Sequence, residues 1–316
     1  MSRQQTSIEQ DQTFSWFLRA AREGDPYAQF NLGMLYKNGA GVQRDDVAAL
    51  AWLRRAAEQG LAFAQNHLGA MLYSGRAPSG DAGRDDAEAA YWLSRAAEQG
   101  DASAQQNLGL LHDQGRGVVR DSEAALGWFY RAAEQGIASA QTLLAECYLY
   151  GRGVAINYPL AAAWLRQAAE QGNAQAQFNL GVMHAAGQGV AVDPSRAARW
   201  YAMAAAQGDA SAQNNLGVLY AGGDGVRADD KVAVHWYRAA AEQGHALAQY
   251  NLSGMLGSGR GGGYDSVRAH MWMLLAAGSG DAAACASVRA AARRLSASQV
   301  ASAEEMVRAW QRAHRA

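Results

Sequence analysis

The hydrophobic residues of this chain recur in short segments that each have the periodicity of one helix face. Between residues 28 and 36, apolar side chains follow the i, i+4, i+7, i+8 spacing of a single helix side, at Ala28, Leu32, Leu35 and Tyr36. The segment from Asp45 to Glu58 has a second apolar face, made of Ala48, Trp52, Leu53, Ala56 and Ala57. Glycines separate the two segments. The pattern predicts two helices joined by a short loop.

This helix pair is copied along the chain. The sequence Ala-Ala-Glu-Gln-Gly occurs at 56–60, 96–100, 132–136, 168–172 and 240–244. Tryptophan keeps a spacing of 36 residues, apart from one step of 40, at Trp16, Trp52, Trp92, Trp128, Trp164, Trp200, Trp236 and Trp272. A fixed period of this length is the signature of a repeat architecture. We predict that these indoles occupy one repeated position and anchor the core.

Glycine marks the ends of the predicted helices. A Gly-x-Gly-Val sequence separates the two helices in most repeats, beginning at Gly39, Gly115, Gly151, Gly187 and Gly223. Glycine adopts the left-handed conformation that ends many helices without a Cβ penalty. A following aspartate has the position of a helix N-cap, and we expect this role of Asp45, Asp85, Asp121, Asp193, Asp229 and Asp265.

Another glycine lies in the middle of the first helix of most repeats, at Gly33, Gly69, Gly109, Gly181 and Gly217. Glycine inside a helix costs about 1 kcal/mol relative to alanine. We therefore expect a neighbouring helix, or the indole of the tryptophan position, to approach the backbone closely at this point.

These residues resemble the Sel1-like repeat family, which is related to the tetratricopeptide repeat. The resemblance is to the pattern A-x-x-x-L-G-x-x-Y-x-x-G-x-G-V-x-x-D-x-x-x-A-x-x-W-Y-x-x-A-A-x-Q-G and extends over residues 25–280. It implies an all-α fold, a right-handed α-solenoid of helix-turn-helix repeats in which each repeat contacts mainly its neighbours. The predicted repeats are 25–60, 61–100, 101–136, 137–172, 173–208, 209–244 and 245–280.

The segments outside the repeats are expected to cap the ends of the solenoid. Residues 1–24 include a lone second helix, which carries Trp16 and forms the N-terminal cap. Residues 281–316 lose the tryptophan spacing but stay helical, and Ser296 and Gln299 have the spacing of a capping box. We interpret them as C-terminal capping helices. The second repeat also has four extra residues in its loop, within 76–83, whose role is open.

Charge and composition exclude several functions. The chain has 28 basic and 29 acidic residues and a formal net charge of −1, so no general field attracts nucleic acid. Gly-Arg-Gly sequences at 115–117, 151–153 and 259–261 add only scattered positive loop tips. No apolar run approaches the roughly 18 residues of a transmembrane helix. We expect no membrane insertion and a cytoplasmic location, and the Arg-, Ala- and Gly-rich composition favours a bacterial source.

No catalytic or metal-binding motif is recognisable. Cys147 and Cys285 stand far apart, without a metal-ligand spacing. HExxH, GxSxG and Walker A sequences are absent, and the Gly-x-Gly loops lack the flanking strand of a phosphate loop. A glutamate repeated in the second helices is interpreted as solvent-exposed, at Glu58, Glu98, Glu134, Glu170 and Glu242. We predict a protein without enzyme activity, cofactor or metal.

The first helices carry the candidate binding residues, because in tetratricopeptide-type solenoids these helices line the concave surface. One first-helix position is asparagine in five repeats, at Asn31, Asn107, Asn179, Asn215 and Asn251. An amide side chain both donates and accepts, so it can hold the backbone of an extended peptide. The same amide can instead bond to a neighbouring helix. Both interpretations are open at this stage.

Positions beside this asparagine vary between repeats, as recognition positions do. Tyr27, Phe30, Met34 and Phe63 predict an aromatic and apolar patch towards the N-terminal end, with Lys37 as its amine. Aromatic and methionine side chains are favoured interface anchors. The predicted partner-binding residues are Tyr27, Phe30, Asn31, Met34, Lys37, Phe63, Asn66, Asn107, Phe178, Asn179, Asn214, Asn215, Tyr250 and Asn251.

The sequence therefore predicts a scaffold or adaptor that binds a segment of a protein partner in its concave groove. The resemblance implies this general role, since members of the family serve as adaptors. Two alternatives remain: an inhibitor or immunity-type protein that binds one specific partner, and a hydrolase acting on β-lactams or cell wall. The second alternative follows from cysteine-rich relatives, whose regular cysteine pairs this chain lacks.

Overall fold

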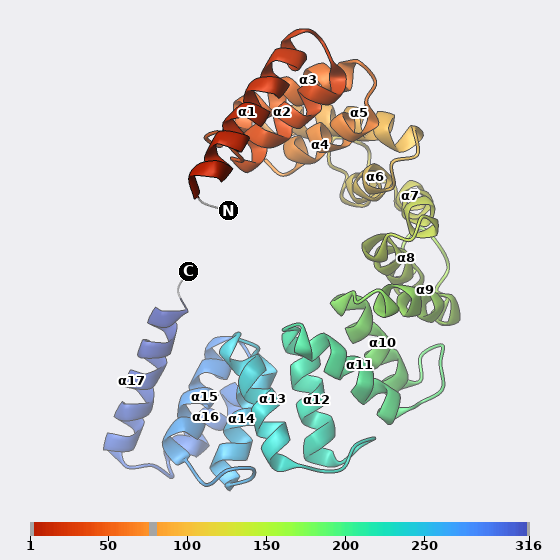
Figure 1. Cartoon of the computed structure of the whole chain (residues 1–316). Coiled ribbons are helices and arrows are strands. Elements are labelled where there is room, and N and C mark those ends of the chain that lie inside the picture. Colours follow the sequence, from red (N-terminus) through yellow and green to blue (C-terminus); the bar gives the residue numbers. More distant parts are fainter. Residues whose placement is uncertain (1–2, 76–80, 315–316) are drawn as a thin grey trace. The chain divides into compact units, whose positions relative to one another are not determined.

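The computed structural model describes residues 3–75 and 81–314, and within them it contains 17 α-helices and no strand. The chain divides into two compact units, Met1–Asn157 and Tyr158–Ala316. Within each unit, helices that follow one another in the sequence pack side by side, except that the last helix, α17, packs on α15 (Figure 1). The predicted all-α solenoid of helix pairs is confirmed.

Each unit is built from alternating first and second helices of the repeats. The first unit contains α1 (Arg3–Arg22), α2 (Pro26–Asn38), α3 (Asp46–Glu58), α4 (Ala62–Tyr73), α5 (Ala82–Glu98), α6 (Ala102–Gln114), α7 (Ser122–Glu134) and α8 (Ala138–Tyr150). The second contains α9 (Tyr158–Glu170), α10 (Ala174–Ala186), α11 (Pro194–Ala206), α12 (Ala210–Gly222), α13 (Asp230–Glu242), α14 (Ala246–Ser258), α15 (Ser266–Gly278), α16 (Ala282–Ala292) and α17 (Ala297–Ala313). Of the loop insertion at 76–83, residues 76–80 lie outside the described residues.

The predicted helix ends are confirmed in most repeats. Five aspartates accept hydrogen bonds from backbone N–H groups of the first turn of a second helix, at Asp45, Asp121, Asp193, Asp229 and Asp265. The prediction is wrong for Asp85, because α5 begins at Ala82 and therefore includes Asp85. First helices end at left-handed glycines, as predicted for Gly39, Gly115, Gly151, Gly187 and Gly223.

The repeated tryptophan is not the general core anchor that the sequence suggests. Trp92 and Trp272 are buried, but most of the other indoles are half-buried, and Trp16 is 55% exposed. Arginine guanidinium groups lie 4.5 Å from the ring centres of Trp52 and Trp128. The residue after the tryptophan fills the core instead, and it is fully or almost fully buried at Leu53, Leu93, Phe129, Leu165, Tyr201 and Tyr237. The second helix is rotated about its axis so that this residue points into the core, and the preceding indole therefore lies at the edge of the core.

This rotation also explains the glycine inside the first helices. A Cβ atom at Gly109 would lie 2.6 Å from the ring of Phe129, and one at Gly181 would lie 2.7 Å from the ring of Tyr201. The expected close approach is therefore present, but the residue after the tryptophan makes it rather than the indole. The second loop glycine has a different partner: a Cβ at Gly117 would overlap the backbone carbonyl of Asp86 in the preceding repeat.

Buried glutamines join successive repeats. Each first helix carries one, whose Nε2 donates to a backbone carbonyl near the end of the preceding helix, as Gln29 does to Ala21 at 3.1 Å. Its Oε1 accepts from the glutamine that ends the following second helix, and the described pairs are Gln59–Gln29, Gln99–Gln65, Gln135–Gln105, Gln207–Gln177 and Gln243–Gln213, at 2.7–2.8 Å. We call these bonded pairs the glutamine ladder. The regular spacing of the glutamines in the sequence could have predicted it.

The arginines of the Gly-Arg-Gly loops are not the scattered positive tips that the sequence suggests. Arg116 makes a bidentate ion pair with Asp86 of the preceding repeat and donates to the carbonyl of Tyr73 at 3.0 Å. Arg260 repeats this arrangement with Asp230 and the carbonyl of Ala221. Both guanidinium groups are therefore paired with carboxylates of the preceding repeat and join consecutive repeats.

The C-terminal helices cover the last repeat. Ser296 and Gln299 form the predicted capping box at the start of α17, which is confirmed. The helix packs on α15, where Trp310 meets Trp272 edge to face with ring centres 6.3 Å apart. Ala303 is completely buried in the same cluster.

Candidate partner-binding surface

The first helices α2 and α4 place two large aromatic side chains on the protein surface. Tyr27 is 61% exposed and Phe63 is 58% exposed, and they occupy the same first-helix position in successive repeats. The two helices lie next to each other, because the rings of Phe30 in α2 and His67 in α4 have centres 5.4 Å apart. Leu247 of α14, 46% exposed, has the same position in the second unit and was missed at the sequence level. An alignment of the repeats places Leu247 in the same column as Tyr27 and Phe63 and could have identified it.

Half-buried side chains lie beside the exposed aromatics of α2 and α4. Phe30 and His67 have ring centres 5.4 Å apart, and Met34 is half-buried. The Nζ of Lys37 lies 3.5 Å from Nδ1 of His67. Burial, followed by the nearby charge of Lys37, lowers the pKa of His67. A neutral imidazole with an acceptor nitrogen suits this arrangement, since the lysine ammonium can only donate. We call Tyr27, Phe30, Met34 and Phe63 the aromatic patch.

The asparagines of the first unit bond to the protein itself. Asn31 donates to the carbonyl of Tyr27 in its own helix at 2.8 Å. Asn107 donates to Asn66 at 3.3 Å, and Asn66 donates in turn to Asp101 at 3.1 Å. The bonds of Asn66 and Asn107 link neighbouring first helices, which is the structural alternative raised from the sequence.

The second unit has a similar amide network. Asn251 donates to Asn214 at 3.0 Å, and Asn214 donates to Asn215 at 3.2 Å. Asn214 is 2% exposed, so in this structure it has almost no surface for a partner. Asn179 accepts from the neighbouring Gln175 at 3.1 Å.

The predicted aromatic residues of the second unit are less exposed than those of the aromatic patch. Phe178 and Tyr250 are half-buried, and Phe178 lies 6.0 Å from Tyr201 between ring centres. The predicted residues therefore fall in two groups, one in each unit. In the second group, hydrogen bonds join Asn214, Asn215 and Asn251, whereas Phe178 and Asn179 contact residues outside the predicted set. The aromatic patch is the group with the larger exposed apolar side chains.

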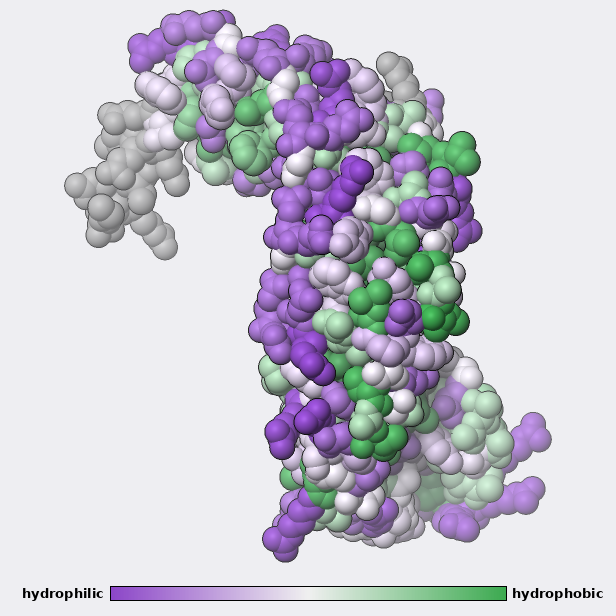
Figure 2. Space-filling view, turned by 90° about the vertical axis from the view of Figure 1, so that its right-hand side faces the viewer, coloured by the Kyte–Doolittle hydropathy of each residue, from purple (hydrophilic) through white to green (hydrophobic). Residues whose placement is uncertain are grey.

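Other hydrophobic side chains are exposed at loops and helix ends. On the face seen in Figure 2, hydrophobic residues form small patches among hydrophilic ones. Exposed examples outside the first helices include Val119, Ile156, Val192 and Tyr264. Single exposed apolar residues are common in proteins. The aromatic patch differs because its members come from adjacent helices.

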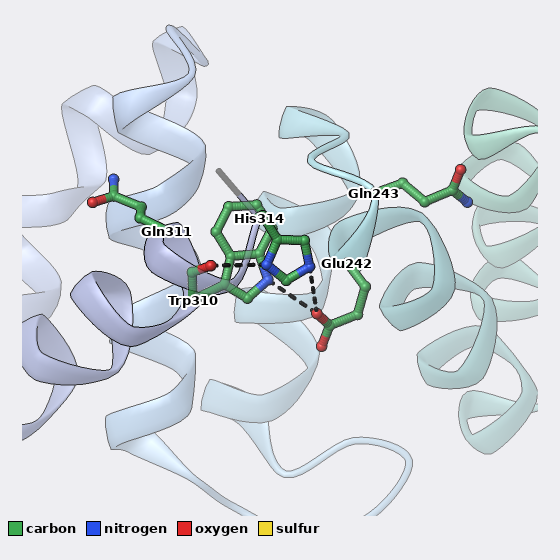
Figure 3. A pocket seen from close by; sticks show the side chains of 5 residues that line it. All are labelled: Glu242, Gln243, Trp310, Gln311 and His314. Atoms are coloured by element: carbon green, nitrogen blue, oxygen red, sulfur yellow. Dashed lines mark hydrogen bonds and ion pairs between the residues drawn. The ribbon is translucent and has the colours of Figure 1, made fainter. Parts of the chain in front are cut away.

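A pocket of about 460 Å³ lies where α17 meets the end of α13. Figure 3 shows Trp310 and His314 directed towards Glu242. The indole Nε1 donates to Glu242 Oε2 at 2.9 Å, His314 Nε2 lies 3.9 Å from the same oxygen, and the two rings stack with centres 4.0 Å apart. Glu242, interpreted from the sequence as a solvent-exposed glutamate, thus also fixes the C-terminal helix.

The candidate chemistry of the remaining polar groups is limited. Burial raises the pKa of the Cys147 thiol to about 11, so this side chain stays protonated and is a weak nucleophile at neutral pH. Within residues 3–75 and 81–314, no group of three or more His, Cys, Asp or Glu side chains is arranged to hold a metal ion. No helix of this described part is long and apolar enough to cross a membrane.

The repeats match a known family model. The model, described as the Sel1 repeat, matches residues 9–25, 26–61, 62–101, 102–137, 138–173, 174–209, 210–245 and 246–281. The first and shortest match falls on the segment that the sequence predicts as the N-terminal capping helix. No protein of curated function is significantly similar in sequence.

Solved structures of bacterial proteins share the fold. A Sel1 repeat protein from Oxalobacter formigenes is 35% identical, with a TM-score of 0.69, over 87% of this chain and 79% of that one. A protective antigen of uropathogenic Escherichia coli strains with an SLR fold is 28% identical, with a TM-score of 0.53, over 95% of this chain and 79% of that one.

Proposed function

The chain belongs to the Sel1 repeat family, and from that premise we propose that it is a non-enzymatic scaffold that binds an extended partner segment along its first helices. Sel1 repeat proteins are generally binding scaffolds. The observation that carries the proposal for this chain is the aromatic patch. Tyr27 and Phe63 are exposed at equivalent positions of adjacent repeats, which spaces two anchors along one helical surface.

The composition of the patch indicates what kind of segment fits. Large aromatic and methionine side chains at the centre of an interface supply much of its binding energy. Helices hold the backbone of these residues, so little backbone entropy is lost on binding. Lys37 brings a single positive charge beside the patch, and the neighbouring His67 is held neutral. Apolar anchors therefore suit the patch better than a strongly acidic tail, which would need several positive charges.

The asparagines contribute to this site by holding the first helices in register. Asn66 and Asn107 bond across neighbouring helices, which fixes the distance between the side chains around them. We assign them to positioning, and we assign direct contact to Tyr27, Phe30 and Phe63.

A paired-variant capture experiment tests the proposal. The full chain and the double variant Tyr27→Ser, Phe63→Ser are each used to capture proteins from a lysate of the source organism. The matched control is Tyr91→Ser, Tyr130→Ser, which removes two exposed tyrosines from second helices. We expect the first variant to lose at least about tenfold of the specifically bound protein, and the control to retain it.

A photo-crosslinking amino acid in place of Phe63 then identifies contact directly. The proposal expects a crosslink to the same captured protein. Capture that is equal for both double variants, together with no crosslink at position 63, contradicts the proposed site.

A further inference from the structure

A second candidate site lies in the second unit, away from the first-helix surface. An open pocket of about 360 Å³ is lined by residues of α9, α10 and α11. Its lining contains three arginines, an indole, a methionine, a histidine and one carboxylate, from Arg166, Glu170, His184, Arg196, Arg199, Trp200 and Met203. Arginine, tryptophan and methionine are among the residue types enriched in protein interfaces.

The repeat symmetry shows what this position holds elsewhere in the chain. In the first unit, Arg54 makes an ion pair with Glu88 of the next repeat, at 2.6 Å. The same carboxylate oxygen of Glu88 accepts from the indole Nε1 of Trp92 at 3.1 Å. A carboxylate therefore lies between a guanidinium group and an indole N–H, and the protein supplies all three.

The pocket has the same two donors but no carboxylate at the repeat position of Glu88. Arg166 and Trp200 occupy the repeat positions of Arg54 and Trp92, while Arg196 replaces the glutamate. Arg196 pairs with its own N-cap, Asp193, at 3.1 Å. Among the residues that the structure describes, Arg166 and Arg199 have no ion-pair partner and Trp200 Nε1 has no acceptor.

A buried histidine adds a further polar group. His184 is 3% exposed and lines the pocket, and its Nδ1 has no hydrogen-bond partner within the described part of the chain. Buried polar atoms without a partner are uncommon, because each one loses its bonds to water. An oxygen atom of a ligand in this pocket is a suitable partner for an N–H group at that position.

We infer that this pocket binds one acidic side chain of a protein partner. The carboxylate occupies the place that Glu88 has in the first unit, between the Arg166 guanidinium and the Trp200 N–H, with Arg199 beside it. An adjacent apolar side chain of the partner packs on Met203 and the indole of Trp200. This inference rests on the proposed protein-binding role but assigns a different surface.

The local charge favours a carboxylate over a phosphate. The three arginines are accompanied by Glu170 in the pocket and by Asp193 on Arg196, which leaves one uncompensated positive charge. A single carboxylate neutralises that charge, whereas a phosphate dianion exceeds it. Arginine forks also match the two oxygens of a carboxylate.

The variant Arg196→Glu gives a sharp test, because it restores the glutamate of the first unit. The new carboxylate is expected to pair with Arg166 and Trp200. It should therefore occupy the place of the partner's carboxylate, without loss of thermal stability. A phage-displayed library of random peptides is selected on the full chain. We expect the recovered peptides to be enriched in Asp or Glu next to an apolar residue.

Binding of these peptides is then compared among variants by titration. We expect Arg196→Glu and Arg166→Ser to weaken binding by about tenfold or more. The control Arg308→Ser, Arg312→Ser changes two exposed arginines of α17 and is expected to leave it unchanged. Replacement of Tyr27 and Phe63 by serine is also expected to have no effect, which separates this site from the aromatic patch.

Two results overturn the inference. One is that substitution of Arg166 or Arg196 weakens the binding of none of the selected peptides. The other is that phosphopeptides show this dependence while acidic peptides do not, which makes the pocket a phosphate site. If the capture experiment shows that the aromatic patch binds no partner, the peptide titrations still test the pocket independently.

Discussion

At the scale of single residues, close contacts decide which glycines are required. Gly109 lies inside α6, and a Cβ atom there would meet the ring of Phe129 at 2.6 Å and the carbonyl of Ala125 at 3.3 Å. Phe129 is completely buried, so its ring has little room to move. The gain of about 1 kcal/mol from replacing a helical glycine is therefore smaller than the strain from overpacking.

We predict that Gly109→Ala destabilises the protein by about 1–2 kcal/mol in denaturant unfolding. Gly127 of α7 is the matched control, because it is also helical but a Cβ atom there would meet no atom of another element within 4 Å. Gly127→Ala should stabilise the protein by about 0.5–1 kcal/mol. Equal effects of the two substitutions would show that the Phe129 contact is unimportant.

His245 is a second residue whose environment gives a measurable prediction. It is the N-cap of α14, and its Nδ1 accepts from the backbone N–H of Ala248 at 3.2 Å, which requires an unprotonated nitrogen. Burial is the main reason that the pKa of His245 is lowered from its ordinary value of 6.5. As pH falls below that value, the unfolded chain takes up the proton first, so His245 reduces stability towards acid pH.

We predict that His245→Asn reduces the loss of stability between about pH 7 and pH 5. Asparagine does not titrate and already caps α10, where Asn173 accepts from Ala176 at 2.9 Å. The reciprocal change, Asn173→His, should increase the loss over the same range. Urea unfolding at several pH values measures both. Unchanged pH dependence in both variants would contradict the assignment.

At the scale of elements, Glu242 joins the last helix to the second helix of a repeat. Trp310 of α17 and His314, the C-cap of that helix, both reach its carboxylate (Figure 3). An interaction at one end of a helix affects the opening of that helix more than global unfolding. Removing the charge should therefore loosen α17 while the repeats stay folded.

We predict that Glu242→Gln increases hydrogen exchange of the last turns of α17 by several-fold, with a small change in melting temperature. Glu134→Gln is the matched control, because Glu134 has the same repeat position but accepts from Tyr130 within its own helix. Exchange of α17 should be unaffected in that variant. Equal exchange in wild type and Glu242→Gln would mean that packing on α15 alone holds the helix.

At the scale of the whole molecule, the features predicted from the sequence are those that depend on local chemistry. Left-handed glycines such as Gly115 and N-caps such as Asp121 require only their own turn. The choice between Trp128 and Phe129 as the core residue was not predictable in this way. Both are apolar and adjacent, and the position of the facing glycine helix decides which one is buried.

The candidate sites depend even more on contacts between repeats. Tyr27 and Phe63 could be identified because the same first-helix position is aromatic in two adjacent repeats. The arginine pocket could not, since its meaning depends on the contact between Arg54 and Glu88, which lie 34 residues apart. Once that contact is known, aligning the repeats shows that Arg196 replaces the glutamate that pairs with Arg54 in the first unit.

The coupling between repeats also sets the stability of the ends of the chain. In a repeat protein, stability is approximately the sum of the repeats and their interfaces, so a weak last interface permits the end to open. The glutamine ladder weakens at this end. Gln249 is fully buried, yet its Oε1 has no partner within the described residues, because Ser279 stands where preceding repeats have the donating glutamine.

We predict that Ser279→Gln completes the ladder and stabilises the protein by about 1 kcal/mol, the net contribution of a typical hydrogen bond. The expected donor is the new Nε2, as in the 2.8 Å bond from Gln243 to Gln213. Gln243→Ser removes that bond and should destabilise by a similar amount. Denaturant unfolding of the two variants, with hydrogen exchange of α14 and α15, measures the effect. If Ser279→Gln is neutral while exchange of α14 is unchanged, water or a relaxed side chain already satisfies Gln249.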